Sequence, residues 1–136
     1  LYSDEDKIDE TGARSAPYFK PEWNPDLFLS QNLFNHLTVY RRQLVQEVGG
    51  FRLGFEGSQD YDLALRILER TSAERIVHIP FILYHWRAIA GSIAMGAGEK
   101  TYAHDRARQA LQEHLDRIGS KAQAVAGHAS FHRVLW

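Results

Sequence analysis

The stretch GSQDYDLALR, residues 57–66, holds the start of the helix that we expect at the centre of the fold. This helix is predicted to run from near Ser58 to about Arg70. Apolar residues at helical spacing form one of its faces, namely Tyr61, Ala64, Leu65 and Leu68. Leu63 and Ile67 add apolar side chains outside that face, so the helix is expected to be buried.

Two carboxylates, Asp60 and Asp62, stand in the first turn of this predicted helix. In a structural interpretation, Ser58 and Asp60 cap the free amides of the first turn and the acids complement the helix dipole. In a functional interpretation, Asp60 is a general base at the mouth of a cleft, within reach of a substrate hydroxyl. Asp62 is expected to pair with Arg66, four residues further along the helix. The residues alone leave both interpretations of Asp60 open.

On the N-terminal side of this helix the pattern alternates between short elements and loops. Apolar and β-branched residues predict strands, and a Pro in a first turn or a Gly after a last turn marks the limits of helices. We expect a strand at 1–3, an extended loop over 7–26, a helix from Asn24-Pro25-Asp26, a strand at 37–40, and a helix at 41–48 that ends at Gly49-Gly50.

On the C-terminal side, the clearest element is a helix over 99–118 that is capped by Gly119. Its apolar stripe consists of Ala103, Ala107, Leu111, Leu115 and Ile118. Before it, two strands at 76–79 and 81–86 are expected to join at Pro80, and the tail predicts a pair of strands around 125 and 131–135.

Composition excludes several classes of protein. The chain has 136 residues, enough for one core, and a net charge of −1 from 16 basic and 17 acidic side chains, so no global field attracts nucleic acid. The absence of cysteine excludes disulfides and thiolate metal sites, and no apolar run approaches the roughly 20 residues of a membrane span. We therefore expect a cytoplasmic protein without nucleic-acid partners.

Three consecutive acids, Asp4-Glu5-Asp6, directly follow the first predicted strand. Carboxylates this close repel each other by roughly 1 kcal/mol per pair even in water, so something must offset the cost. A solvated turn does so in one interpretation. In the other, Asp4 and Asp6 point toward a hard divalent cation, Mg²⁺ or Mn²⁺, that also takes phosphate oxygens.

Two further segments carry polar chemistry. In the segment Tyr84-His85-Trp86-Arg87, His85 is a candidate metal ligand and Arg87 a candidate for binding phosphate or carboxylate; alternatively, both cap the strand before a Gly91-Ser92 turn. Gly49-Gly50 would allow the backbone to approach a bound sugar closely, or would simply end a helix.

Taken together, these segments resemble the family 2 glycosyltransferases, which are inverting enzymes of the GT-A fold. The resemblance covers roughly residues 1 to 95 and is strongest to bacterial, often multidomain enzymes that build surface polysaccharide. The segments that carry it are YSDEDK (2–7), PYFKPEWNPDLFLSQN (17–32), HLTVYRR (36–42), EVGGFRLGFEGSQDYDLALR (47–66) and HIPFILYHWR (78–87).

The resemblance implies a role for each candidate residue. Asp4 and Asp6 would hold the divalent cation against the diphosphate of a nucleotide-sugar donor, with His85 as a later ligand. Asp60 would be the base that deprotonates a glycan or lipid-linked acceptor, although Gln59 stands where the family has Glu. The remaining residues expected to bind donor or acceptor are Glu5, Trp23, Gly49, Gly50, Gln59 and Arg87.

The fold class implied is α/β: residues 1–98 form a partial GT-A domain that lacks the N-terminal nucleoside-binding βαβ half, and 99–136 form a helix and a linker or hairpin. The missing half of the same polypeptide is an expected partner, the chain alone is expected to be inactive, and the full-length enzyme would lie in the cytoplasm or at the inner face of the plasma membrane.

Two alternative functions remain. One is a non-catalytic module that binds carbohydrate or another partner through Tyr18, Phe19, Trp23 and Trp86; the other is a structural fragment that self-associates through an exposed sheet edge.

Overall fold

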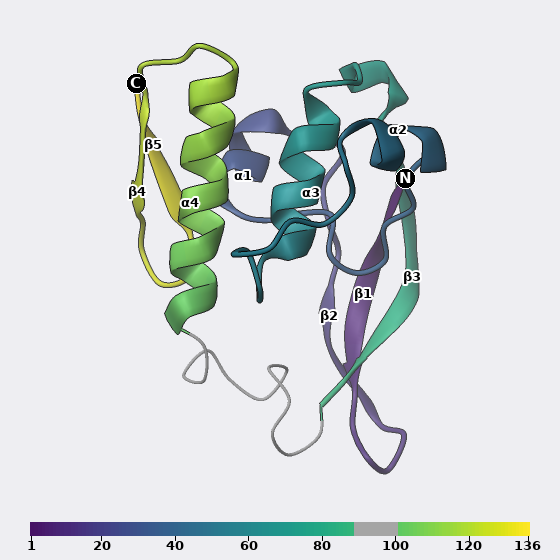
Figure 1. Ribbon diagram of the computed structural model, residues 1–136. Coiled ribbons are helices and arrows are strands. Elements are labelled where there is room, and N and C mark those ends of the chain that lie inside the picture. Colours follow the sequence, from purple (N-terminus) through teal and green to yellow (C-terminus); the bar gives the residue numbers. More distant parts are fainter. Residues whose placement is uncertain (89–100) are drawn as a thin grey trace.

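The computed structural model describes residues 1–88 and 101–136 and has a mixed α/β architecture (Figure 1). A three-stranded sheet lies on one side, a two-stranded hairpin lies on the other, and the longer helices stand between them. The predicted α/β class is confirmed at this level. Within the described ranges, no helix combines the length and apolar character needed to cross a membrane.

The acidic triplet lies inside a strand. β1 (Tyr2–Ile8) is the central strand of the sheet, and it pairs antiparallel with β2 (Arg14–Tyr18) and parallel with β3 (His78–Arg87). The predicted strand at 1–3 is therefore too short, and the predicted loop over 7–26 is wrong where it contains β2. Pro17 argued against a strand in this part of the sequence. β2 is an edge strand, however, and an edge strand tolerates a residue that cannot donate a backbone hydrogen bond.

β3 is one strand, where two were predicted. Its register against β1 jumps from Ser3↔Ile79 to Asp4↔Ile82, so Pro80 falls at an irregularity of the ladder. The missing amide of Pro80 therefore interrupts no regular pairing, and the strand continues through it.

The predicted strand at 37–40 is also wrong, since this segment forms only an isolated bridge between Thr38 and Tyr2. Its backbone still binds the start of β1, with the amide of Val39 donating to the carbonyl of Leu1 at 3.0 Å.

The helices follow their local signals closely. α1 (Pro25–Ser30) is capped by Asn24, whose side chain accepts from the amide of Leu27 at 2.9 Å, and α2 (Arg42–Glu47) ends before Gly49-Gly50 as predicted. α3 (Gln59–Leu68) is buried from Tyr61 to Ile67, which confirms the expected central helix. A short 3₁₀ helix, η1 (Ala73–Arg75), leads from α3 toward β3.

The C-terminal segment consists of α4 (Thr101–Arg117) and the antiparallel pair β4 (Gln123–Ala126) and β5 (His132–Leu135), so the predicted helix and strand pair are confirmed. The predicted helix start at 99, the Gly91-Ser92 turn and the 98/99 domain boundary lie outside the described residues. Of the predicted apolar stripe, Ala107, Leu111 and Leu115 are buried, whereas Ile118 is 53% exposed.

One core joins the two ends of the chain. Tyr2 of β1 and Leu65 of α3 belong to the same buried cluster as Ala107 and Leu111 of α4. Residues 101–136, predicted as a linker region, therefore pack as an integral layer of the molecule, with the hairpin on the opposite side of the helices from the sheet.

Candidate functional site

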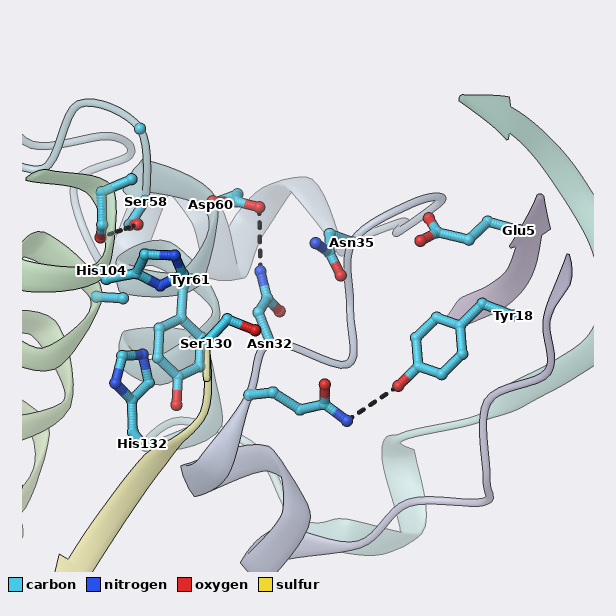
Figure 2. Close-up of a pocket in the computed structure, with 14 residues that line it drawn as sticks. Glu5, Tyr18, Asn32, Asn35, Ser58, Asp60, Tyr61, His104, Ser130 and His132 are labelled. Atoms are coloured by element: carbon cyan, nitrogen blue, oxygen red, sulfur yellow. Dashed lines mark hydrogen bonds between the residues drawn. The ribbon is translucent and has the colours of Figure 1, made fainter. Parts of the chain in front are cut away.

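A polar cleft of about 320 Å³ opens between the start of α3, the loop after α1, the β1–β2 edge and the wall formed by α4 and β5 (Figure 2). Carboxylates of Glu5 and Asp60 reach it from different elements. The other polar groups that line it are amides, hydroxyls and imidazoles, from Gln31, Asn32, Asn35, Tyr18, Ser58, Ser130, His104 and His132. This lining offers many hydrogen-bonding groups, and its two carboxylates are balanced by neither Lys nor Arg among the described lining residues, which suits a polar ligand without negative charge.

Asp60 stands at the mouth of the cleft as the second residue of α3. Its carboxylate is exposed, and its Oδ2 accepts a hydrogen bond from Nδ2 of Asn32 at 3.0 Å. Asn32 is itself fixed, because its Oδ1 accepts from the amide of Phe34 at 3.0 Å. The pair orients one carboxylate oxygen, so the arrangement suits a base that must meet a hydroxyl in a defined direction.

The capping role considered for Ser58 is wrong. Ser58 occupies the N-cap position of α3, but its side chain makes no capping hydrogen bond there. Its hydroxyl instead donates to the carbonyl of Ala103 in α4 at 2.7 Å. Ser58 therefore ties the start of α3 to the opposite wall of the cleft.

Asp62 lies on the buried side of α3 and is fully inaccessible to solvent. Its Oδ2 accepts from Arg66 at 2.7 and 3.0 Å, which confirms the predicted pair, and both of its oxygens also bind Arg52. Arg52 reaches on to Glu113 of α4 at 2.8 Å. Burial by itself would raise the pKa of Asp62, but the hydrogen bonds from Arg52 and Arg66 hold it below its ordinary value.

Gly49 and Gly50 form the end of α2, with φ angles of +80° and +68° that favour glycine. Arg66 fixes this turn by donating to the carbonyls of Val48 and Gly50, each at 2.6 Å. The glycines thus serve the helix end here, and their predicted contact with a sugar stays a prediction.

The acidic triplet is buried and each carboxylate has partners of its own. Glu5 accepts from the amide of His36 at 2.8 Å, meets its Nδ1 at 2.9 Å, and lies 3.8 Å from Nζ of Lys20. Burial by itself would raise the pKa of Glu5, but the bonds to His36 and the charge of Lys20 lower it. Glu5 is the member of the triplet that lines the cleft with Asp60.

The two outer acids are engaged elsewhere. Asp4 accepts from the amide of Lys20 at 2.9 Å and meets Nε2 of His78 at 2.7 Å. Asp6 lies 2.5 Å from Nε of Arg14 and 2.5 Å from Nδ1 of His85. These histidines, Arg14 and backbone amides offset the mutual repulsion of the triplet.

The predicted cation site is only partly assembled. His85 does meet Asp6, whereas Asp4 is paired with His78. Over residues 1–88 and 101–136, no group of three or more His, Cys, Asp or Glu is arranged to hold a metal ion. The arrangement does not fit a preformed site, so we derive no chemical step through a metal, and cation binding by Asp4, Asp6 and His85 stays a prediction.

Three other predicted binding residues have structural partners. The Gln59 side chain accepts from the amide of Gly57 at 2.7 Å, and Arg87 is paired in register with Ile8 at the end of β3. The Trp23 ring packs 5.3 and 5.5 Å from the rings of Phe28 and Phe34, among the core aromatics. Their roles in binding donor or acceptor stay predictions.

Sequence reasoning missed Lys20 and the cleft residues Asn32, His104 and His132. The Lys20 side chain is completely buried, and its Nζ donates to the carbonyls of Asn35 and His36. Burial lowers the pKa of Lys20 to about 8, although the neighbouring Glu5 and Asp4 oppose that shift. A charged residue inside an aromatic and proline-rich segment, FKPEW at 19–23, was the available signal for Lys20.

Two curated proteins resemble this chain closely. The O-antigen biosynthesis protein RfbC of Myxococcus xanthus is 46% identical over 98% of this chain, and the uncharacterized protein y4gI of Sinorhizobium fredii is 49% identical over all of it. The chain spans only 10% and 15% of the length of these two relatives, respectively. No family model matches the chain. No solved structure matches it either.

Proposed function

We propose that this chain forms the acceptor side of an enzyme that transfers a sugar from a nucleotide-sugar donor to a glycan or lipid-linked acceptor with inversion, as in the family 2 glycosyltransferases. The observation that carries the proposal is the exposed carboxylate of Asp60, which Asn32 orients at the mouth of a polar cleft. Similarity to a protein named for O-antigen biosynthesis supports a role in building polysaccharide.

In this proposal, the acceptor hydroxyl enters the cleft and meets the carboxylate of Asp60. Asn32 engages Oδ2, which leaves Oδ1 to take the hydroxyl proton. The acceptor oxygen then attacks the anomeric carbon, a new carbon–oxygen bond forms, and the bond to the diphosphate breaks with its electron pair leaving on the nucleoside diphosphate. Attack from the side opposite the leaving group inverts the configuration at that carbon.

The divalent cation stays a separate part of the proposal. Titration calorimetry with Mn²⁺ tests it, and we expect only weak binding to the chain by itself, because two carboxylates leave most ligand positions to water. Sub-micromolar affinity would contradict this expectation.

The proposal is tested by Asp60→Asn in a longer protein that contains this chain together with the expected nucleoside-binding half. This longer protein is assayed with a panel of nucleotide-sugars. This change keeps size and hydrogen bonding but removes the proton acceptor, so turnover is expected to fall by about 10²–10⁴-fold while donor affinity changes little. Asp62→Asn is the matched control at the buried side of the same helix, with reduced stability and retained turnover expected. A fully active Asp60→Asn enzyme would show that Asp60 is not the base. Glycan binding with no turnover in the unmodified longer protein would favour a non-catalytic carbohydrate-binding module instead.

A further inference from the structure

One wall of the cleft comes from the C-terminal segment. His104 of α4, Ser130 of the β4–β5 turn and His132 of β5 line the same cavity as Asp60 (Figure 2). In this view the His132 ring lies below that of His104 and beside that of Tyr61. The region predicted as a linker therefore contributes directly to the proposed site.

His132 contributes to this wall a buried side chain whose hydrogen bonding is incomplete. The residue is only 7% exposed, and its buried Nδ1 has no hydrogen-bond partner among residues 1–88 and 101–136. Buried polar atoms are nearly always paired with protein, water or a ligand, so an unpaired nitrogen in a residue that lines a cavity makes this residue a candidate for binding a ligand.

The ring of His132 is held firmly in this position. It stacks on the ring of Tyr61 with centroids 6.2 Å apart and an interplanar angle of 13°. Its own carbonyl accepts from Oγ of Ser30 at 2.8 Å, and its backbone pairs with Ala126 across the hairpin. The stacked ring and the paired backbone limit the motion of this side chain, which reduces the ordering cost of binding a ligand through its imidazole.

The charges around the cleft limit the kind of ligand. Glu5 and Asp60 are carboxylates, and the described residues that line the cleft include neither Lys nor Arg. Burial, together with the smaller effects of the charges on His104 and Arg108, lowers the pKa of His132 to about 4, so its imidazole is neutral near pH 7. This environment disfavours phosphate and suits an uncharged hydroxyl group.

We propose that His132 hydrogen-bonds a hydroxyl of an uncharged saccharide, so that the C-terminal hairpin forms one wall of the acceptor subsite. That the bound sugar is the acceptor rests on the proposed function, whereas the binding of a neutral sugar by His132 rests on the geometry of the cleft.

The test uses the 136-residue chain labelled with ¹⁵N and observes the imidazole resonances of His132. The probes are neutral methyl hexopyranosides of the gluco, galacto and manno series, with inorganic phosphate and Zn²⁺ as competing ligand types. We expect at least one glycoside to shift the His132 resonances saturably. His132→Phe, which keeps the ring stacked on Tyr61, is expected to weaken that binding by about tenfold, as expected for losing one hydrogen bond.

His128→Phe is the matched control, because His128 lies on the same hairpin, is exposed, and does not line the cleft. It is expected to bind the glycoside as the unmodified chain does. The proposal is overturned if no glycoside moves the His132 resonances, if only phosphate or Zn²⁺ moves them, or if His132→Phe binds with unchanged affinity. If His132→Phe does not fold, the resonances of the unmodified chain decide the question.

Failure of this inference is distinguishable from failure of the proposed function. The turnover of Asp60→Asn reports on proton transfer, whereas the His132 resonances report on glycoside binding, so the two measurements can fail separately. A glycoside that binds at His132 in a longer protein that remains fully active with Asp60→Asn would support the subsite and reject the base.

Discussion

Asp60 and Asp62 stand two residues apart in α3, yet they lie in opposite environments. Asp62 belongs to an ion cluster, defined here as Arg52, Asp62, Arg66 and Glu113, in which two guanidinium groups hold its buried carboxylate. Asp60 lies at the cleft mouth and has one amide partner, Asn32. The difference shows that position on the helix, more than residue type, separates a carboxylate that stabilises the fold from one that is available to a substrate.

The ion cluster also links three helices. Arg66 holds the end of α2, Asp62 joins it to Arg52, and Arg52 reaches Glu113 on α4. Removing the charge of Asp62 leaves the buried guanidinium of Arg66 without its counter-charge, which costs more than an exposed pair contributes. Stability depends much less on the pair of Asp60 and Asn32 at the cleft mouth, because water can replace either hydrogen-bonding partner there.

The largest expected effect is therefore on the buried side of α3. Asp62→Asn should lower the free energy of unfolding by about 3 kcal/mol, because Arg52 and Arg66 lose their shared counter-charge. Urea denaturation followed by circular dichroism measures this change. Asp60→Asn serves as control, with a change within about 0.5 kcal/mol expected. Equal losses at the two positions would remove the distinction between cluster and cleft.

The second prediction separates the two regions by pH. The pKa of His132 is lowered from 6.5 to about 4 on folding, so the unfolded chain takes up this proton first as pH falls. The contribution of His132 to the free energy of unfolding is therefore fully present above pH 6.5. It is lost as the pH falls toward about 4, which lowers the free energy of unfolding by about 2–3 kcal/mol. The pKa of Asp62 is lowered from an ordinary value of 3.8, so its contribution is lost at still lower pH.

Unfolding by urea at a series of pH values checks this prediction. His132→Phe should flatten the curve between pH 6.5 and 4 and leave the more acidic part unchanged, whereas Asp62→Asn should do the reverse. A His132→Phe variant whose stability follows the unmodified pH curve would show that His132 is not buried in its neutral form.

A smaller effect is expected where the cleft walls meet. Ser58→Ala removes the hydroxyl that donates to the carbonyl of Ala103 and should cost about 1 kcal/mol. Thermal unfolding measures it, with Ser120→Ala as control, since the Ser120 hydroxyl accepts only a local bond from Ala122. An unchanged melting temperature would mean that this bond does not join α3 to α4 in solution.

The smallest effect on stability is expected for Asn32→Ala at the cleft mouth. Its bond to Asp60 is exposed, so the free energy of unfolding should fall by about 0.5 kcal/mol. If Asn32 orients the base, Asn32→Ala should also lower turnover in the longer protein, because the carboxylate of Asp60 is no longer held in one direction. Unchanged turnover would assign Asn32 a merely structural role.

Local chemistry in the sequence predicted much of the fold. Asn24-Pro25 begins α1, Gly49-Gly50 ends α2, and the apolar spacing in GSQDYDLALR marks a buried helix, because capping and periodicity act over a few residues. The pair Asp62–Arg66 was predictable for the same reason, since residues four apart on a helix are neighbours.

Pairing between distant segments was much harder to predict. β2 contains Pro17 and few strand-forming residues, and it becomes a strand only because β1 offers it an edge. The continuity of β3 through Pro80 likewise depends on where its register against β1 shifts. Tertiary context overrides local propensity at such positions.

Residue type and order were enough to identify the candidates for chemistry, the acids of the triplet and Asp60 among them, because these are local properties of the chain. Which of them share a cleft depends on how distant segments pack: Glu5, and neither Asp4 nor Asp6, lines the cleft with Asp60, and His132 lines its far wall. The physical reason is that a single core packs β1, α3 and α4 together, and this packing brings residues 5, 60 and 132 to one cavity although no local pattern in the chain links them.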